Sequence, residues 1–521
     1  MSDAGADGNL RLRRGVYALL VALSVGSMLG RILAVDSVDQ QALEQSRVRS
    51  VFGGHASLED YLDWKWRDLE NHGFRGERLE AEFQRARRLK AEQLADARLA
   101  RPFLSANDRS RWCMIRALVE PRMRVPGAPY AIDRVIAEPG WDTIDMVKHD
   151  GHLYSSKPPL FPTLLAGQYW LIHRLTGLSL GRHPYVVGRI MLVSVNVLPL
   201  VLYFWLLALL AERFGASDWG RIFVMAAAAF GTFLTTFAVV LNNHLPAAVS
   251  VAIALYAAVR IWFDGERRLW YFAVAGIFAA FCVANELPAA AFFAALSLAV
   301  LWKAPKETLV AYVPAALLVA AGFFATNWIA HQSLRPPYMH RSETNPADDW
   351  YTYEYEHKGQ IVQSYWQNRV GVDRGEPSPA VYALHALVGH HGVFSLTPVW
   401  LLSVAGLGIW LWRPRDARLR ELAILIAAVS LVCLVFYLTR PQDDRNYGGM
   451  TSGLRWMFWF APMWLVAMLP AADAMAGRRW TRALAMVLLV LSVLSASYPT
   501  WNPWTHPWLL NFLHYLGWVV V

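Results

Sequence analysis

Cysteine and charge are both scarce in this chain. Only three cysteines occur among 521 residues, and two of them, Cys282 and Cys433, fall inside apolar runs. The sequence therefore supports neither a disulfide framework nor a thiolate metal site. Charged residues make up 17% of the chain and hydrophobic residues 55%. Since a soluble chain of this length needs a far more polar surface, we expect most of it to lie in lipid.

The sequence also lacks the motifs of nucleotide chemistry. It has no Walker A sequence and no Gly-rich loop after a strand, so neither an ATP-driven pump nor a soluble nucleotide-sugar domain is expected. The net charge of +9 does not indicate a nucleic-acid partner, because excess Lys and Arg in a membrane protein marks cytoplasmic loops and anionic lipid.

Long apolar runs dominate what is present. Runs of about 20 residues can cross a bilayer, and they predict an all-α, polytopic transmembrane helical protein with about 11 spans. Arg11, Arg13 and Arg14 precede the first run, which lacks a cleavage pattern and is interpreted as an anchor. The predicted spans are 15–34, 187–211, 222–241, 245–262, 270–286, 288–302, 308–331, 393–412, 421–439, 456–476 and 483–499.

Lys and Arg cluster in alternate short connections, such as 213–221, 267–268 and 413–420. By the positive-inside rule these connections face the cytoplasm, as does the N-terminus. The other turns and the large loops then face outward from the plasma (inner) membrane. Every unusual polar motif lies on that outer side, so function is predicted there.

These patterns divide the chain into a tail with the first span (1–34), a large outer loop (35–186), a bundle (187–331), a second outer loop (332–392) and a C-terminal bundle with an outer tail (393–521). The helical spacing of 57–100 predicts a solvated hairpin, with a separate binding module as the alternative. Segment 160–178 must not cross the membrane if the topology is to hold, so it is expected to lie in the interface.

Two motifs in the first outer loop resemble a known family. NDRSRW (Asn107–Trp112) is followed by GWDTIDMVKHDGHLYSSKPPLFP (Gly140–Pro162), which leads into an apolar helix. Together with a late Gly-Gly to Arg455 element, they resemble the GT-C glycosyltransferases, in the branch of protein mannosyltransferases and the aminoarabinose transferase of lipid A. The resemblance implies inverting transfer of a sugar from a polyprenyl-phosphate donor to an acceptor on the outer face.

Asp108 is the predicted catalytic residue. Sugar transfer requires the acceptor hydroxyl to lose a proton, and an outward carboxylate near the interface suits a general base. Arg109, Arg111 and Lys157 are the nearest cations for the leaving phosphate. The alternative is that Asp108 is the N-cap of a helix starting at Arg109.

Two further outer turns carry candidate binding groups. Asn242, Asn243 and His244 stand where many members of the resembled family hold an acidic residue, which disfavours a divalent metal and leaves His244 as a hydrogen-bond donor to phosphate or sugar, with Asn243 as a neighbouring binding group. They could instead cap the helix at Pro246. Glu286 lies near a membrane boundary, where an ionisable group usually faces a cavity or a partner, although it too could belong to a helix cap.

The loop 332–392 interleaves aromatics with carboxylates, as carbohydrate sites do. Asp373, Arg374 and Glu376 are candidate acceptor or phosphate ligands, and Tyr365 and Trp366 are candidate stacking residues. An interfacial aromatic belt is the alternative. The nearby histidines (His385, His390 and His391) lack a carboxylate at a familiar ligand spacing, so a metal site there is not favoured.

In the element DDRNYGGMTSGLRW, Gly448, Gly449 and Gly453 allow close backbone approach to a ligand and Arg455 can bind phosphate. A tight turn with a snorkelling Arg is the alternative.

The sequence thus predicts a membrane glycosyltransferase whose partners are a polyprenyl-phosphate sugar, membrane lipid and an unidentified acceptor, with no certain cofactor. Two other classes stay open: a secondary transporter, which requires interrupted helices and paired halves, and a non-catalytic scaffold, for which Asp108 would be dispensable.

Overall fold

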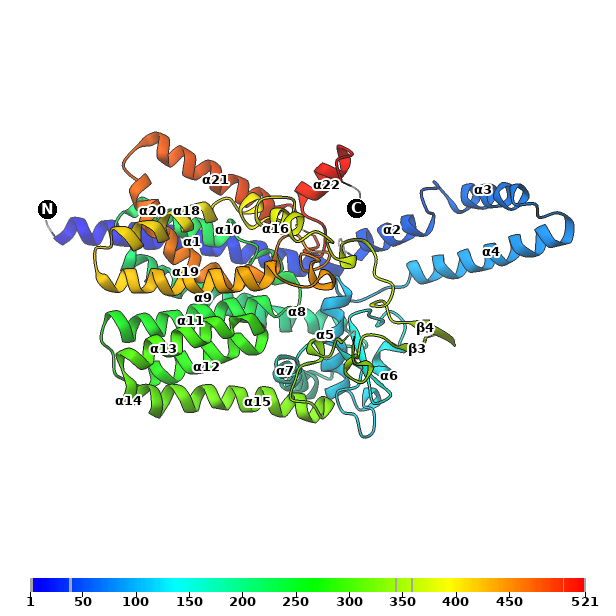
Figure 1. Ribbon diagram of the computed structural model, residues 1–521, viewed down its shortest axis with the longest axis horizontal. Coiled ribbons are helices and arrows are strands. Elements are labelled where there is room, and N and C mark those ends of the chain that lie inside the picture. The colour runs from blue at the N-terminus through cyan, green and yellow to red at the C-terminus, as the bar shows by residue number, and fades with distance from the viewer. Residues whose placement is uncertain (1–2, 37–39, 343, 358, 500, 520–521) are drawn as a thin grey trace.

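The computed structural model describes residues 3–36, 40–342, 344–357, 359–499 and 501–519. The described chain is helical with two small hairpins (Figure 1). The helices of its first half are α1 (Asp3–Ala34), α2 (Gln40–Val51), α3 (Leu58–Asn71), α4 (Gly76–Ala97), α5 (Ala106–Val119), α6 (Asp133–Ile136), α7 (Leu160–Thr176), α8 (Pro184–Leu192), α9 (Leu198–Phe214), α10 (Asp218–Phe230) and α11 (His244–Phe263).

The helices of the second half are α12 (Leu269–Asn285), α13 (Ala290–Lys303), α14 (Pro305–Glu307), α15 (Val313–His331), α16 (Pro379–Leu387), α17 (Val393–Leu396), α18 (Trp400–Trp412), α19 (Ala417–Leu438), α20 (Ala461–Met475), α21 (Arg479–Ser497) and α22 (Trp508–Tyr515). Antiparallel hairpins pair β1 (Met146–His149) with β2 (His152–Ser155), and β3 (Glu354–His357) with β4 (Gln360–Gln363). Short 3₁₀ and π segments carry the label η.

The apolar helices form one bundle, as expected of a polytopic membrane protein. Among the described residues, seven helical stretches are long and apolar enough to cross a membrane, and three shorter apolar helices accompany them. The seven are Leu10–Ala34, Pro184–Phe214, His244–Phe263, Pro305–His331, Ala417–Leu438, Arg455–Met475 and Arg479–Ser497; the shorter ones are Leu269–Asn285, Leu287–Lys303 and Trp400–Trp412. Ten of the eleven predicted spans therefore coincide with an apolar helix.

The eleventh prediction, a continuous span over 222–241, is wrong. Helix α10 ends at Phe230, and an irregular stretch with a 3₁₀ turn at Thr236–Val239 (η4) follows before α11 begins. Gly231 and three threonines in GTFLTTF are poor helix formers, so the helix stops inside the apolar run. The irregular backbone is buried, as it must be at membrane depth.

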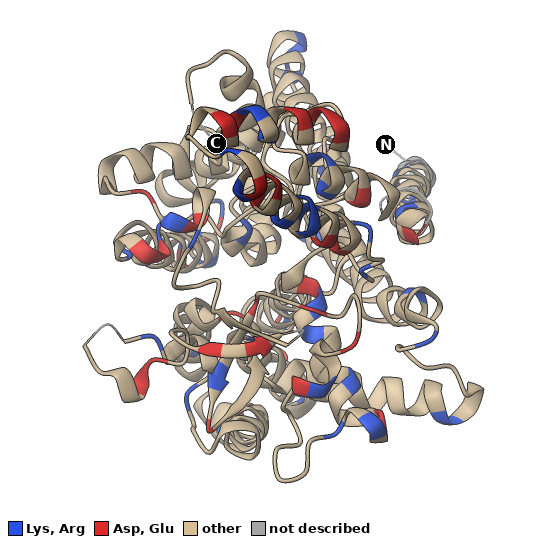
Figure 2. Ribbon diagram, turned by 90° about the vertical axis from the view of Figure 1, so that its right-hand side faces the viewer, with Lys and Arg blue, Asp and Glu red and all other residues tan. Residues whose placement is uncertain are grey.

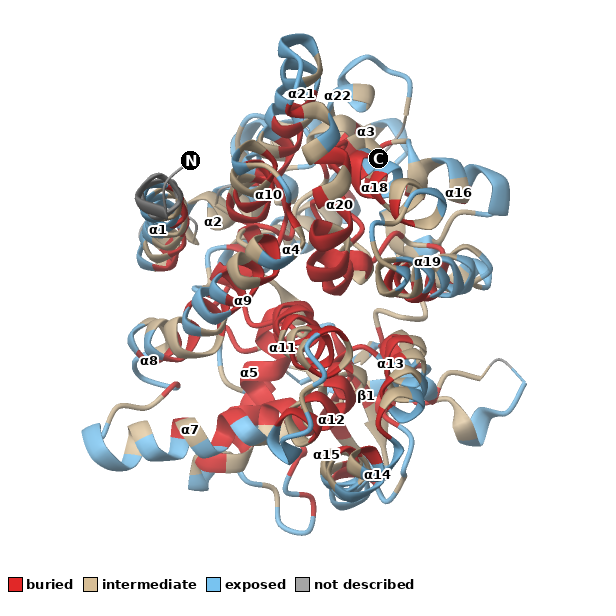
Figure 3. Cartoon of the chain, turned by 90° about the vertical axis from the view of Figure 1, so that its left-hand side faces the viewer, coloured by how far each residue is buried: buried red, intermediate tan, exposed pale blue. Residues whose placement is uncertain are grey.

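The core lies around α11 and α20, which Figure 3 shows largely buried. Small residues let these helices approach their neighbours closely. A Cβ on Gly406 of α18 would lie 1.9 Å from the carbonyl oxygen of Ala467 in α20. A Cβ on Gly276 of α12 would lie 2.3 Å from the carbonyl oxygen of Tyr312. Only glycine fits at these two crossings.

The two ends of the bundle differ. At the end that holds the short basic connections, ion pairs join successive loops: Arg13 with Glu212, Arg213 with Asp264 at 2.6 Å, and Lys303 with Glu421 at 2.9 Å. At the opposite end lie α5, α6, the hairpin β1–β2 and the loop 332–392 (Figure 1). Both signs of charge are scattered over that end in Figure 2.

Two segments of the first large loop lie apart from the parallel helices of the bundle. Helices α3 and α4 pack on each other as a hairpin that projects away from the bundle (Figure 1), and Trp66 meets Phe83 edge to face at 5.0 Å. Helix α7 lies crosswise to the bundle helices (Figures 1 and 3), and 160–178 is therefore not aligned with the helices that cross the membrane.

The second large loop is fastened over the first. The ring of Trp350 stacks on His340 at 3.6 Å and on His149 of β1 at 4.0 Å. The backbone N–H of Lys148 donates to the carbonyl of Trp350 at 3.0 Å. These contacts hold 332–392 against the hairpin β1–β2, so residues from both loops share one end of the molecule.

Candidate active site

Helix α5 is the polar centre of this end. Ser105 caps it and accepts the backbone N–H of Asp108 at 3.1 Å. Although the helix carries four charged side chains, all four are buried. Because a buried charge is costly unless it is paired, every one of these side chains must find a partner in the surrounding loops.

Asp108 is the third residue of α5 and is 1% exposed. Its Oδ1 accepts hydrogen bonds from Trp112 Nε1 at 2.9 Å and from the backbone N–H of Leu241 at 2.9 Å. The predicted alternative, in which Asp108 caps the helix, is wrong because Ser105 takes that position. The irregular stretch after α10 brings the Leu241 amide to the carboxylate.

Burial raises the pKa of Asp108 to about 7, although the Leu241 and Trp112 hydrogen bonds oppose the shift. At neutral pH such a carboxyl group exists in both protonation states, which is the condition for accepting a proton and later releasing it. Asp108 also lines a small pocket with Leu104, Tyr185 and Val239.

Arg111 connects α5 to the start of α11. Its guanidinium donates to the Asn107 carbonyl oxygen at 2.9 Å and side-chain Oδ1 at 2.7 Å, and to Oδ1 of Asn243. Burial lowers the pKa of Arg111 to about 10, so it stays cationic at neutral pH. Asn107 in turn donates to Asp145 Oδ2 at 2.8 Å.

Lys157 lies at the other end of this chain of contacts, where its ammonium pairs with Asp145 at 2.7 Å. Burial lowers the pKa of Lys157 to about 8, against the opposing charge of Asp145. Burial by itself raises the pKa of Asp145, but the charge of Lys157 and the hydrogen bonds from Lys157 and Ser156 hold the pKa of that carboxyl below its usual value. Asp145 is a residue that the sequence interpretation missed.

Asn243, His244 and Glu286 meet where α11 begins and α12 ends. Asn243 Nδ2 donates to Glu286 Oε1 at 2.7 Å, and His244 Nδ1 contacts the same oxygen. Neither Asn243 nor His244 caps α11 with its side chain; Asn242 instead accepts the backbone N–H of Leu245 at 2.9 Å. Asn243 thus occupies the N-cap position without a capping side-chain hydrogen bond, and the capping alternative is confirmed for Asn242 but not for His244.

Arg455 completes the network from the turn that precedes α20 (residues 443–456), called the late turn below. Its Nη1 lies 3.1 Å from His244 Nε2, and its Nε donates to the Gly448 carbonyl at 2.9 Å. Glycine is favoured at 448, because φ there is +92° and a Cβ would also lie 3.1 Å from Arg455 Nε. One continuous network thus runs from Lys157 through Arg111, Asn243 and Glu286 to Arg455.

The remaining predicted residues fall outside this network. Arg109 donates to the backbone carbonyls of Asp142 at 2.7 Å and Pro102 at 3.1 Å, so it fastens the loop. Asp373 accepts from Tyr365 Oη at 2.8 Å and Asn446 Nδ2 at 3.1 Å, at the edge of the Arg455 turn.

Arg374 is exposed and donates to the carbonyl of Arg369, and Glu376 accepts the backbone N–H of Ser378. Trp366 packs against Tyr351 edge to face at 5.6 Å. Within the described residues, no group of three or more His, Cys, Asp and Glu side chains is arranged to hold a metal ion.

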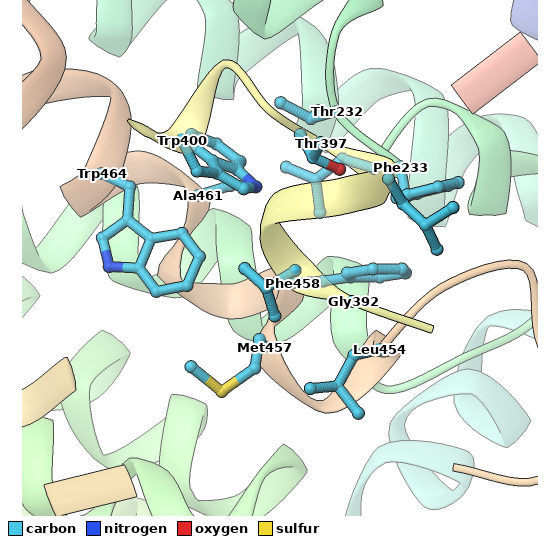
Figure 4. A pocket seen from close by; sticks show the side chains of 13 residues that line it. Thr232, Phe233, Gly392, Thr397, Trp400, Leu454, Met457, Phe458, Ala461 and Trp464 are labelled. Atoms are coloured by element: carbon cyan, nitrogen blue, oxygen red, sulfur yellow. The ribbon is translucent and has the colours of Figure 1, made fainter. Parts of the chain in front are cut away.

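Two apolar cavities flank the network. The larger, with a volume of about 600 Å³, lies between α12, α13 and α15, and its lining residue Leu287 is next to Glu286 in the chain. The second is lined by Phe233 of the irregular stretch, Thr397 and Trp400, and by Leu454 and Phe458 of the late turn (Figure 4). Leu454 precedes Arg455.

Comparison with known proteins gives a distant likeness. No protein-family model and no curated protein matches the chain. Solved structures of the Archaeoglobus fulgidus oligosaccharyltransferase in the apo form and of AglB from the same organism with an inhibitory peptide and dolichol-phosphate match 77% of this chain, at 14% and 12% identity and a TM-score of 0.37. The chain spans about half the length of these proteins, covering 52% of each.

Proposed function

We propose that the chain is a membrane glycosyltransferase of the GT-C type, which moves a sugar from a polyprenyl-phosphate donor to an acceptor at the outer face. The single observation that supports this best is Asp108, a buried carboxyl group with a pKa of about 7 beside a cluster of cations. A base next to a phosphate site is what the reaction requires.

In the proposed step, the acceptor hydroxyl oxygen forms a bond to the anomeric carbon of the sugar while the bond from that carbon to the phosphate oxygen breaks. The hydroxyl proton passes to Asp108, and the phosphate leaves with the bonding electron pair. Inversion follows from a single displacement. Trp112 and the Leu241 amide hold Asp108 in one orientation throughout.

The leaving phosphate would be bound by Lys157, Arg111 and Arg455. These three cations face two carboxylates in the network, Asp145 and Glu286, which leaves an excess of one positive charge. Preorganised cations in a water-poor site stabilise a developing negative charge strongly. Arg111 and Arg455 add planar donor groups suited to phosphate oxygens.

The cavity between α12, α13 and α15 supports a lipid-linked donor. Its lining runs from Leu309 near the basic connections to Met339 at the outer end, and it is almost entirely apolar. A prenyl chain lying there would bring its phosphate to the outer end of α12, where Glu286 belongs to the network.

The orientation is also part of the proposal. The ion-paired end of the bundle carries the short Lys- and Arg-rich connections, which the positive-inside rule places in the cytoplasm. The network at the opposite end then faces outward from the plasma membrane, where polyprenyl-linked sugars would be used without a nucleotide.

The experiment compares cells expressing the wild-type chain, Asp108→Asn and Asp133→Asn at equal levels, with lipid-linked sugars and envelope glycans measured by mass spectrometry. Asp133 is the matched control, a carboxylate of the same loop that accepts the Leu153 amide at 3.1 Å outside the network. We expect one polyprenyl-phosphate sugar to accumulate and one glycoconjugate to disappear in Asp108→Asn alone. Identical profiles in all three strains would refute the proposal.

A secondary transporter is the second candidate, because the helix interrupted after Phe230 is of the kind that such proteins use. It predicts counterflow of a labelled solute in proteoliposomes, and Asp108→Asn would alter that flux without any change in lipid-linked sugars.

A further inference from the structure

Three histidines that the proposed reaction does not use lie together outside the network. The rings of His385 and His390 stack at 3.9 Å, and those of His390 and His391 lie 4.7 Å apart. His391 stacks on Tyr447 of the late turn at 4.7 Å, and Tyr447 contacts Tyr382 of α16 at 4.9 Å. This group is therefore built on the turn that carries Arg455.

The segment after α21, which contains Pro503 and Trp504, packs beside the histidines and the late turn. The carbonyl of Pro503 accepts the backbone N–H of Ser452 at 3.1 Å. Trp504 lies under the guanidinium of Arg455, with 4.9 Å between the guanidinium carbon and the ring centroid. Three segments distant in sequence thus enclose one region directly beside the proposed phosphate site.

This region concentrates buried polar atoms that have no hydrogen-bond partner in the described part of the chain. Tyr382 and Thr451 are 0% exposed, Tyr447 is 5% exposed and Trp504 is 6% exposed. Native proteins leave few such atoms, because each costs the desolvation of its group. The unpaired atoms are Tyr382 Oη, His385 Nδ1, His391 Nε2, Tyr447 Oη, Thr451 Oγ1, Ser452 Oγ, Trp504 Nε1 and His506 Nδ1.

The titratable side chains of this group are uncharged at neutral pH. Burial lowers the pKa of His390 to about 3 and holds the pKa of His391 well below its usual value, while burial raises the pKa of Tyr447. The group therefore offers uncharged donors and acceptors among the aromatic rings of Tyr447 and Trp504. Hydroxyl groups on an apolar ring face, as in a sugar, are complementary to such a surface.

We propose that Tyr447, Thr451, Ser452 and Trp504, with the neighbouring histidines, form a binding subsite for a carbohydrate ring next to Arg455. The subsite deepens the proposed function, because the ring is either the donor sugar attached to the phosphate or a sugar of the acceptor. The unpaired hydroxyl, indole and imidazole groups bond the hydroxyls of the ring.

The test is saturation-transfer NMR on the full chain in nanodiscs, with free glucose, mannose, galactose, N-acetylglucosamine and arabinose as probes. At least one sugar should bind the wild-type chain. Loss of a single neutral hydrogen bond in Thr451→Val or Tyr447→Phe should weaken that binding by about fivefold to tenfold. The thermal midpoint without sugar should stay unchanged or rise, because an unpaired buried hydroxyl has been removed.

Tyr203→Phe is the matched control. Tyr203 is also 0% exposed with an unpaired hydroxyl, but it lies in α9 within the bundle, so its replacement should leave sugar binding unchanged. The proposal is overturned if no probe sugar binds the wild-type chain. It is equally overturned if binding to Thr451→Val and to Tyr447→Phe equals binding to Tyr203→Phe.

Adding a polyprenyl monophosphate distinguishes the two sources of the ring. An interligand Overhauser effect between the sugar and the first isoprene unit identifies the donor sugar, and sugar binding without that effect identifies the acceptor. Asp108→Asn should bind the sugar as well as the wild-type chain does. If the sugar binds but the glycan profile of the Asp108→Asn strain is unchanged, the proposed transferase activity is refuted while the proposed sugar subsite is retained.

Discussion

The chemistry of the site depends at the residue scale on how Asp108 is buried. Its carboxylate is held by one indole and one backbone amide, both neutral donors, and by no direct ion pair among the described residues. Burial therefore outweighs the stabilisation of its charge. An ion-paired carboxylate such as Asp145 shows the opposite shift and would be a much weaker base.

We expect a bell-shaped pH dependence of kcat/KM. Below its pKa of about 7, Asp108 is protonated and cannot accept a proton, so activity should rise with pH through this value. Above its pKa of about 8, Lys157 loses the charge that the proposed mechanism uses to bind phosphate, so activity should fall. Transfer to a labelled acceptor in nanodiscs measures the profile. Lys157→Arg should move the alkaline limb upward and leave the acid limb in place.

Arg455→Lys should reduce transfer by about 10- to 100-fold. Lysine keeps the charge but cannot contact the Gly448 carbonyl, His244 and Trp504 at once, and a hydrogen bond to a charged group contributes about 1.5–3 kcal/mol. Arg374→Lys is the control, because Arg374 is exposed and bonds only to a nearby backbone carbonyl among the described residues. Equal activity of the two variants would exclude Arg455 from the proposed phosphate site.

At the scale of elements, close crossings fix the bundle. Gly406→Ala places a methyl group 1.9 Å from the Ala467 carbonyl oxygen, and forcing α18 from α20 should cost about 1–3 kcal/mol. In Gly322→Ala, a control within α15, the nearest atom is a leucine methyl at 3.5 Å, so this variant should be neutral or slightly stabilising. Thermal unfolding in detergent measures both. A stable Gly406→Ala protein would show that α18 and α20 can separate freely.

The helices and strands also show which parts of the site could have been predicted from the sequence. The turn at Asp150–Gly151 sets the register of β1–β2, which pairs Met146 with Ser155 and so brings Asp145 beside Ser156 and Lys157. That Asp-Gly turn is a recognisable hairpin signal, and it could have revealed Asp145. The helix break after Phe230 likewise had a local signal in Gly231 and the threonines.

Long-range contacts had no such signal. Asn243, Glu286 and Arg455 lie in three different turns, and the hydropathy pattern shows only that these turns share one side of the membrane. Their mutual distances depend on how α11, α12 and α20 pack. The contact of Arg109 with backbone carbonyls was equally hidden, because a sequence does not show which way an arginine turns from a buried helix.

At the scale of the whole molecule, the α3–α4 hairpin is a separable part. Its two helices bury Leu69 and Leu79 between themselves and the chain returns beside α2, where Arg47 Nε bonds the Ala97 carbonyl at 3.0 Å. Replacing residues 58–94 by a short Gly-Ser linker should leave membrane insertion and the thermal midpoint unchanged. Size-exclusion chromatography with a thermal scan measures this. An aggregated product would show that the bundle needs the hairpin.

The ion pairs at the end with the Lys- and Arg-rich connections hold the helices together there. Arg13, Arg213 and Lys303 each join connections that are far apart in sequence, so the helices cannot spread there without several ion pairs breaking together. The opposite end is held mainly by loops laid over one another. Any opening of the bundle should therefore be a splaying of the helix ends at the loop-covered end about a hinge at the ion-paired end, with the largest displacements at α12, α15 and the turn before α20.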